Sequence, residues 1–273
     1  MRGFAERTGL VSDRSEKRYL WTDAFAVCNL LELARQTGEE RYNTLALRLV
    51  DRVHHVLGRF RADDQRTGWI SGLGETEGEA HPTRGGLRIG KRLPERSPEE
   101  PFDERLEWDR DGQYFHYLTK WMLALDQVSG ATGDPRFNLW ARELAEVAHA
   151  SFCYGSRGAR RMVWKMSTDL SRPLVPSMGQ HDPLDGFVTY VQLEATASRL
   201  SSRGMGPGLE EAVAGFAAMI QAIDVRTSDP LGIGGLLSDA CRVAQLVEHE
   251  AFDGEGLLER SLAGARAGLS QYV

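Results

Sequence analysis

Apolar residues in this chain recur every three or four positions over long segments, and almost no segment alternates as a half-buried strand would. All ten prolines lie outside the periodic segments or at their starts. Asp134-Pro135 has the sequence of an N-cap followed by a first-turn proline. The pattern predicts an all-α protein with helices at 21–36, 39–59, 112–131, 135–153, 185–201, 208–224, 233–249 and 256–270.

The predicted helices come in pairs. Short connectors join the first three pairs at Thr37-Gly38, Thr132-Gly133-Asp134 and 202–207, and such a link between amphipathic helices forms an antiparallel helical hairpin. Long segments at 60–111 and 154–184 separate the hairpins, and structureless segments of that length usually carry function. We therefore expect one α/α domain over residues 1–273, with two long loops that form a site.

An internal repeat supports this organisation. Residues 37–43 match residues 132–138 at an offset of 95, and the match continues from Leu49 to Leu144 and from His54 to His149. Repeated helical hairpins predict a solenoid or a closed helical toroid.

Composition narrows the class of protein. Hydrophobic residues make up 41% and charged residues 26% of 273 residues, as in ordinary globular proteins. The net charge of −6 disfavours a nucleic-acid partner. Three cysteines form no disulfide framework, and we expect free, buried thiols. With no apolar leader and no apolar run of 18 residues, we expect a cytoplasmic protein without a membrane partner.

Aromatic and polar residues gather at one end of the predicted bundle. If the hairpins stand side by side, the long loops and the starts of the first helix of every pair share that end. Indole faces beside carboxylates and amides suit sugar recognition, and convergence of this kind in a cleft is typical of small-ligand sites. The candidate substrate-binding residues are Trp21, Asp23, Trp69, Arg88, Trp108, Gln113, Tyr114, His116, Trp164, Lys165, His181 and Asp185.

Two predicted helices are each preceded by two carboxylates. Asp109 and Asp111 stand before one helix, and Asp182 and Asp185 stand before another. One acid of each pair can serve as an N-cap, but two exceed what capping needs. Because glycoside hydrolysis uses two carboxyl groups flanking the scissile bond, we predict Asp109 or Asp111 as one catalytic partner and Asp182 as the other. No cofactor and no metal ion are expected.

Two other functions remain open. A sugar epimerase or isomerase would use His116 or His181 as its acid and base near neutral pH. A helical toroid or open solenoid without catalytic activity would bind a glycan or a protein on its concave face.

The paired helices, their connectors and the stretches 19–25 and 107–113 together resemble the six-hairpin glycosidase superfamily, in a bacterial branch. The likeness extends over most of residues 19–250. It implies an (α/α)6 toroid with a funnel-shaped site at the long-loop end and glycoside hydrolase activity on an oligosaccharide or smaller saccharide. Six hairpins need about twelve helices, more than the pattern predicts. The missing hairpins would expose apolar flanks, so we expect a homo-oligomer or a fragment of a longer chain.

Overall fold

The computed structural model describes residues 1–12, 16–156, 160–249 and 251–271. About 59% of these residues are helical and 6% lie in strands, so the predicted all-α class is confirmed. Within the described ranges, no helix is long and apolar enough to cross a membrane.

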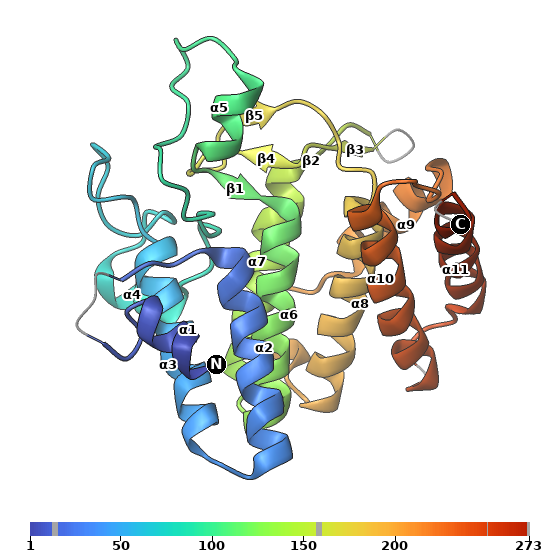
Figure 1. The fold of residues 1–273 in the computed structure, drawn as a ribbon, viewed down its shortest axis with the longest axis horizontal. Coiled ribbons are helices and arrows are strands. Elements are labelled where there is room, and N and C mark those ends of the chain that lie inside the picture. Colours follow the sequence, from blue (N-terminus) through green and yellow to red (C-terminus); the bar gives the residue numbers. More distant parts are fainter. Residues whose placement is uncertain (13–15, 157–159, 250, 272–273) are drawn as a thin grey trace.

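Four antiparallel hairpins make up most of the fold (Figure 1). Each of their eight helices lies within a few residues of a predicted one. The hairpins are α2 (Leu20–Thr37) with α3 (Arg41–Leu57), α6 (Phe115–Thr132) with α7 (Pro135–Phe152), α8 (Asp182–Arg199) with α9 (Glu210–Ala222), and α10 (Pro230–Glu248) with α11 (Glu255–Leu269). Asp134 caps α7 as predicted, because its carboxylate accepts the backbone N–H of Arg136.

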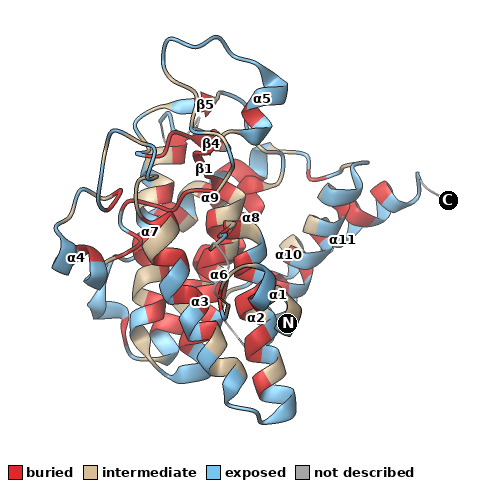
Figure 2. Ribbon diagram, turned by 60° about the vertical axis from the view of Figure 1, so that its left-hand side comes forward, coloured by how far each residue is buried: buried red, intermediate tan, exposed pale blue. Residues whose placement is uncertain are grey.

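The first helices of the hairpins pack in a row. Helix α2 lies against α6, α6 against α8, and α8 against α10, and each of them also packs on its own hairpin partner. All four start at the same end of the molecule, at the top of Figure 1. Helix α6 is central, with Leu118, Trp121 and Leu125 fully buried, and Figure 2 shows burial concentrated around it. The hairpins therefore form an arc whose inner helices run parallel.

The repeat seen in the sequence is a repeated helix end. Helices α2 and α6 stop at Gly38 and Gly133, with φ of +69° and +72°. The N–H of each glycine donates to the carbonyl four residues earlier, and the left-handed conformation suits glycine because it has no Cβ. The same turn thus reverses the chain in both hairpins.

The two long segments contain short helices and strands that the pattern did not predict. The first holds α4 (Glu75–Ala80) and α5 (Glu104–Asp109). Strand β1 (Gln113–Tyr114) pairs with β4 (Lys165–Met166), and β4 pairs with β5 (Pro173–Val175), all antiparallel. A second pair joins β2 (Cys153–Tyr154) to β3 (Arg161–Met162). The remaining elements are α1 (Arg2–Arg7) and the 3-10 turn η1 (Arg203–Met205).

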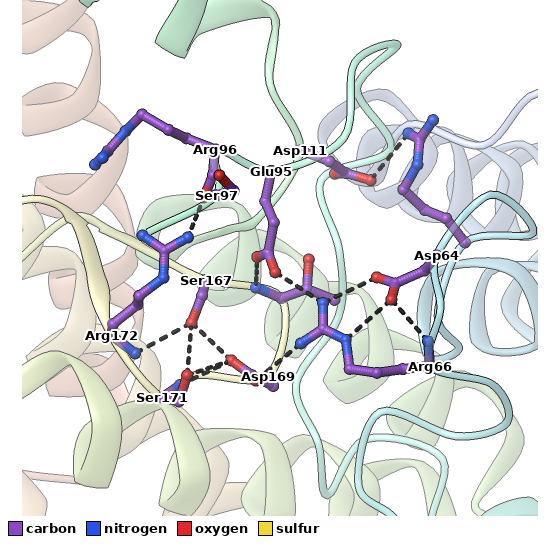
Figure 3. A network of polar contacts seen from close by, with 12 residues as sticks. Asp64, Arg66, Glu95, Arg96, Ser97, Asp111, Ser167, Asp169, Ser171 and Arg172 are labelled. Atoms are coloured by element: carbon purple, nitrogen blue, oxygen red, sulfur yellow. Dashed lines mark hydrogen bonds and ion pairs between the residues drawn. The ribbon is translucent and has the colours of Figure 1, made fainter. Parts of the chain in front are cut away.

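An ion network also joins the long segments (Figure 3). The guanidinium of Arg66 donates to Asp64, to Glu95 at 2.8 Å and to Asp169 at 2.8 Å. Glu95 also accepts the backbone N–H of Thr168. Partly buried charges paired in this way hold residues of both segments together at the end where α6 begins.

The cysteines are free, as expected, but they are not all buried. Cys153 is buried and Cys28 is half-buried, whereas Cys241 is exposed. The expectation of a buried Cys241 was wrong because this residue lies on the outward side of α10.

A matched pair of substitutions tests the hairpin turn. Gly133→Ala should lower the free energy of unfolding by about 1 kcal/mol, because alanine resists a positive φ. No atom lies within 4 Å of the added Cβ, so a steric clash adds nothing to this backbone strain. Gly130→Ala, at an exposed helical position of α6, should raise it by about 0.5–1 kcal/mol. Urea unfolding measures both, and effects of equal sign would contradict the assigned turn.

Candidate functional site

A cluster of charged side chains is buried where α6, α8 and α10 meet. We call it the charged cluster, and it consists of Lys120, Asp182, Asp185, Asp239 and Arg242. Each of the three aspartate residues is at most 7% exposed. Three helices that pack side by side therefore supply one connected group of charges.

The carboxylate of Asp185 is the centre of the charged cluster. It accepts from Lys120 Nζ at 2.7 Å, from Arg242 Nη1 at 3.2 Å and from the hydroxyl of Thr119. Burial alone would raise the pKa of Asp185, but the two cations outweigh it and hold that pKa below its ordinary value. Asp185 is thus a fixed anion.

The two other carboxyls of the charged cluster, Asp182 and Asp239, have the opposite tendency. Burial, together with repulsion from Asp185, raises the pKa of Asp182 to about 7 and the pKa of Asp239 to about 7. Asp239 lies 3.4 Å from Arg242 Nη1. Among the described residues, Oδ2 of Asp182 is buried and has no hydrogen-bond partner. Both groups can exchange a proton near neutral pH.

An aromatic wall borders the charged cluster at the start of α6. His116 Nδ1 lies 4.0 Å from Asp182 Oδ1, and burial lowers the pKa of His116 to about 4, so its ring is neutral at pH 7. Ring centroids 4.9–6.4 Å from that of His116 belong to Trp21, Tyr114, Tyr117 and Trp164. Members of this wall come from α2, β1, α6 and the second long segment.

Helix α2 contributes a further buried acid, Asp23. Its carboxylate accepts the backbone N–H of Tyr19 at 2.9 Å and lies 3.5 Å from Arg18. Burial raises the pKa of Asp23 to about 6, although Arg18 opposes the shift. Trp21 packs 5.0 Å from Tyr117 of α6, so the starts of α2 and α6 meet. The structure thus brings Trp21, Asp23, His116, Asp182 and Asp185 to one end of the bundle.

Asp111 and Asp109, the other predicted catalytic residues, lie apart from the charged cluster. Asp111 is fully buried and accepts from Arg88 at 2.5 Å and from the backbone N–H groups of Gly90 and Lys91. This pairing ties residues 88–91 to the start of α6. Asp109 is exposed on α5. Asp111 is thus paired within the first long segment, whereas Asp239 belongs to the charged cluster.

Two more predicted site residues hold the loops. Gln113 is fully buried and bonds the backbone groups of Gly85, Leu87 and Thr168. Lys165 is also buried, donates to the carbonyl of Glu107 and forms an ion pair with its carboxylate. Burial lowers the pKa of this lysine. The hydrogen bonds of Gln113 and Lys165 thus join the two long segments.

The remaining predicted residues differ in their surroundings. Trp69 is buried beneath the guanidinium of Arg59, 4.3 Å from the ring centroid. His181 lies beside Gly232 rather than against His116. Trp108 is 54% exposed and packs on Trp164. Of these three, only Trp108 presents its ring to solvent.

The sequence analysis did not single out Lys120, Asp239 or Arg242 as site residues. Each lies within a helix, where a charged residue usually faces solvent. A usable signal was their spacing: Lys120 follows His116 by four residues and Arg242 follows Asp239 by three, so each pair shares a helix face.

Arg242 also lines a groove with a volume of about 1220 Å³. The C-terminal halves of α8 and α10 and the start of α9 line it. Arg242 donates to Gln192 at 3.1 Å, and Gln192 donates to Asp126. The charged cluster therefore borders the groove through Arg242 and the aromatic wall through Asp182.

Within the part of the chain that the structure describes, no group of three or more His, Cys, Asp or Glu side chains is arranged to hold a metal ion. Comparison with known proteins found no family, no curated protein and no solved structure that matches this chain.

The raised pKa of Asp182 predicts a pH-dependent stability difference. Because the folded-state pKa of about 7 exceeds the unfolded value of 3.8, the native state keeps a proton that the unfolded chain has lost. The contribution of Asp182 to stability is present below about pH 4 and is lost as the pH rises through 7. Asp182→Asn should therefore gain stability relative to the unsubstituted protein between pH 4 and pH 8, by about 4 kcal/mol.

Urea titrations across that range measure the difference, in which the contribution of Asp239 largely cancels. The exposed Asp109→Asn variant corrects for removing a charge. A difference that does not change with pH would show that Asp182 titrates normally.

Proposed function

We propose that this protein is a carbohydrate-active enzyme that cleaves a glycosidic bond by acid–base catalysis. The reaction takes place in an incomplete (α/α) toroid, at the end where α2, α6, α8 and α10 begin. Asp182 acts as the general acid and Asp239 as the base. The observation that carries the proposal is the buried Asp182, whose Oδ2 has no hydrogen-bond partner among the described residues and whose pKa burial raises to about 7.

The charged cluster suits this division of roles. A glycosidic oxygen must be protonated as it leaves, so the acid needs a proton at the working pH, and the base needs a pKa near that pH. Asp182 and Asp239 both meet the condition, and they lie on the neighbouring helices α8 and α10. When one of them is protonated and the other is ionised, the pair is ready to react.

Lys120 and Arg242 position the reactive pair through Asp185. Both cations bind its carboxylate, and Arg242 also reaches Asp239. Repulsion from the fixed anion Asp185 disfavours a further negative charge on either reactive carboxyl, which supports keeping the acid protonated.

The aromatic wall supports a saccharide as substrate. Trp21 and Trp164 are partly exposed beside His116, and indole faces stack on the C–H faces of a pyranose ring. Polar groups nearby can bond hydroxyls in fixed directions, as ligand sites require.

Sugar epimerisation is the second candidate, because the neutral His116 lies 4.0 Å from a carboxyl that carries a proton. Such a pair can take and return a proton at carbon. Mass analysis separates the two reactions, since hydrolysis adds water and epimerisation leaves the mass unchanged.

The homo-oligomer stays a prediction. Exposed leucines at the end of the arc support it: Leu231, Leu237, Leu262 and Leu269 on α10 and α11. We expect light scattering on the purified chain to give a dimer or larger species, and Leu231→Glu with Leu262→Glu to shift it toward the monomer. A stable monomer before substitution would show that water covers this face.

Activity should depend on Asp182 and not on Asp109. We expect Asp182→Asn to lower kcat on a cleaved oligosaccharide by about 10²–10⁴-fold, because asparagine cannot donate the proton. The kcat/KM profile should be bell-shaped and centred near pH 7, since both reactive carboxyls titrate there. A panel of neutral oligosaccharides, with products detected by mass, provides the assay.

Asp109→Asn is the matched control and should keep full turnover. Full turnover in both Asp182→Asn and Asp239→Asn would contradict the proposed mechanism. If turnover is lost in Asp239→Asn but kept in Asp182→Asn, the general acid is Asp239 on α10 and not Asp182.

A further inference from the structure

Trp108 presents an indole ring to solvent from the short helix α5. Its residue is 54% exposed, and its ring centroid lies 5.4 Å from that of Trp164 at an interplanar angle of 32°. Trp164 is itself held by Ser177, whose hydroxyl accepts the indole N–H at 2.9 Å. The two indoles thus form one tilted pair, which we call the tryptophan platform.

The support beneath the platform is rigid. Glu107, the residue before Trp108, is buried and pairs with Arg96 at 3.0 Å and with Lys165 at 2.9 Å. Asp103 caps α5 by accepting two backbone N–H groups. A large aromatic ring held exposed by a fixed element is typical of a binding surface, because folding alone would favour its burial.

The tryptophan platform leads directly to the proposed acid. The ring of Trp164 lies 6.4 Å from the ring of His116, and His116 lies 4.0 Å from Asp182. Two ring contacts, Trp108 with Trp164 and Trp164 with His116, therefore connect a ligand stacked on Trp108 with the carboxyl beside His116. That arrangement suits a chain of sugar units more than a single unit.

We propose that the tryptophan platform is a second sugar-binding subsite, which makes the protein selective for oligosaccharides over monosaccharides. The inference rests on the proposed function. The apolar face of one sugar would stack on Trp108 while a neighbouring unit reaches Asp182. The exposed carboxylate of Glu104 on the same helix can accept hydrogen bonds from its hydroxyls.

Calorimetric binding in an Asp182→Asn background tests the platform without turnover. The probes are linear glucose and xylose oligosaccharides of one to four units. We expect affinity to rise with chain length, and Trp108→Ala to weaken binding of the longer chains about tenfold while binding of the single sugars stays the same. Leu106→Ala, another exposed apolar residue of α5, is the matched control and should change nothing.

The outcomes separate this inference from the proposed function. Trp108→Ala could weaken binding of the longer chains while the protein with Asp182 intact shows no detectable hydrolysis. That result would support the platform and contradict the enzyme. Hydrolysis with the same chain-length preference in Trp108→Ala would overturn the platform and leave the enzyme standing. If no probe binds, the platform is not a site for these glycans.

Discussion

The negative charge of Asp185 lies in the interior, and the packing of the inner helices depends on neutralising it there. A buried ion without partners costs several kcal/mol, so α6 and α10 must bring Lys120 and Arg242 to the same carboxylate. This requirement fixes the register of three neighbouring helices. Burial and repulsion from this anion together raise the pKa values of Asp182 and Asp239.

The helices, and the end of the bundle at which Trp21, His116 and Asp182 gather, could be predicted from the sequence because their signals are local. Helical periodicity, Gly38 and Gly133 after the helices, and Pro135 at a first turn all act within a few residues. The roles of the acids could not be predicted in the same way. Asp111 and Asp182 look alike in sequence, and only the fold shows that Arg88 and two backbone N–H groups occupy Asp111.

Contacts between distant segments account for most of what the sequence did not show. The strands have two or three residues, too few to display alternation. Asp239 lies in the middle of α10 and resembles a solvated helix residue in the sequence, but the fold buries it 3.4 Å from Arg242. Arg66 likewise joins residues more than 100 positions apart. Interactions of this kind depend on topology and leave no periodic trace.

The hairpin arrangement has a consequence for how the chain folds. Each hairpin joins helices that are neighbours in sequence, so its contacts close only a short loop. The ion pairs of Asp185 instead join residues 57 and 65 positions apart, and closing longer loops costs more entropy. The hairpins are thus the locally folding units, and the charged cluster is complete only after they dock. A substitution that loosens docking would abolish the geometry of the cluster while leaving the helix content of each hairpin nearly unchanged.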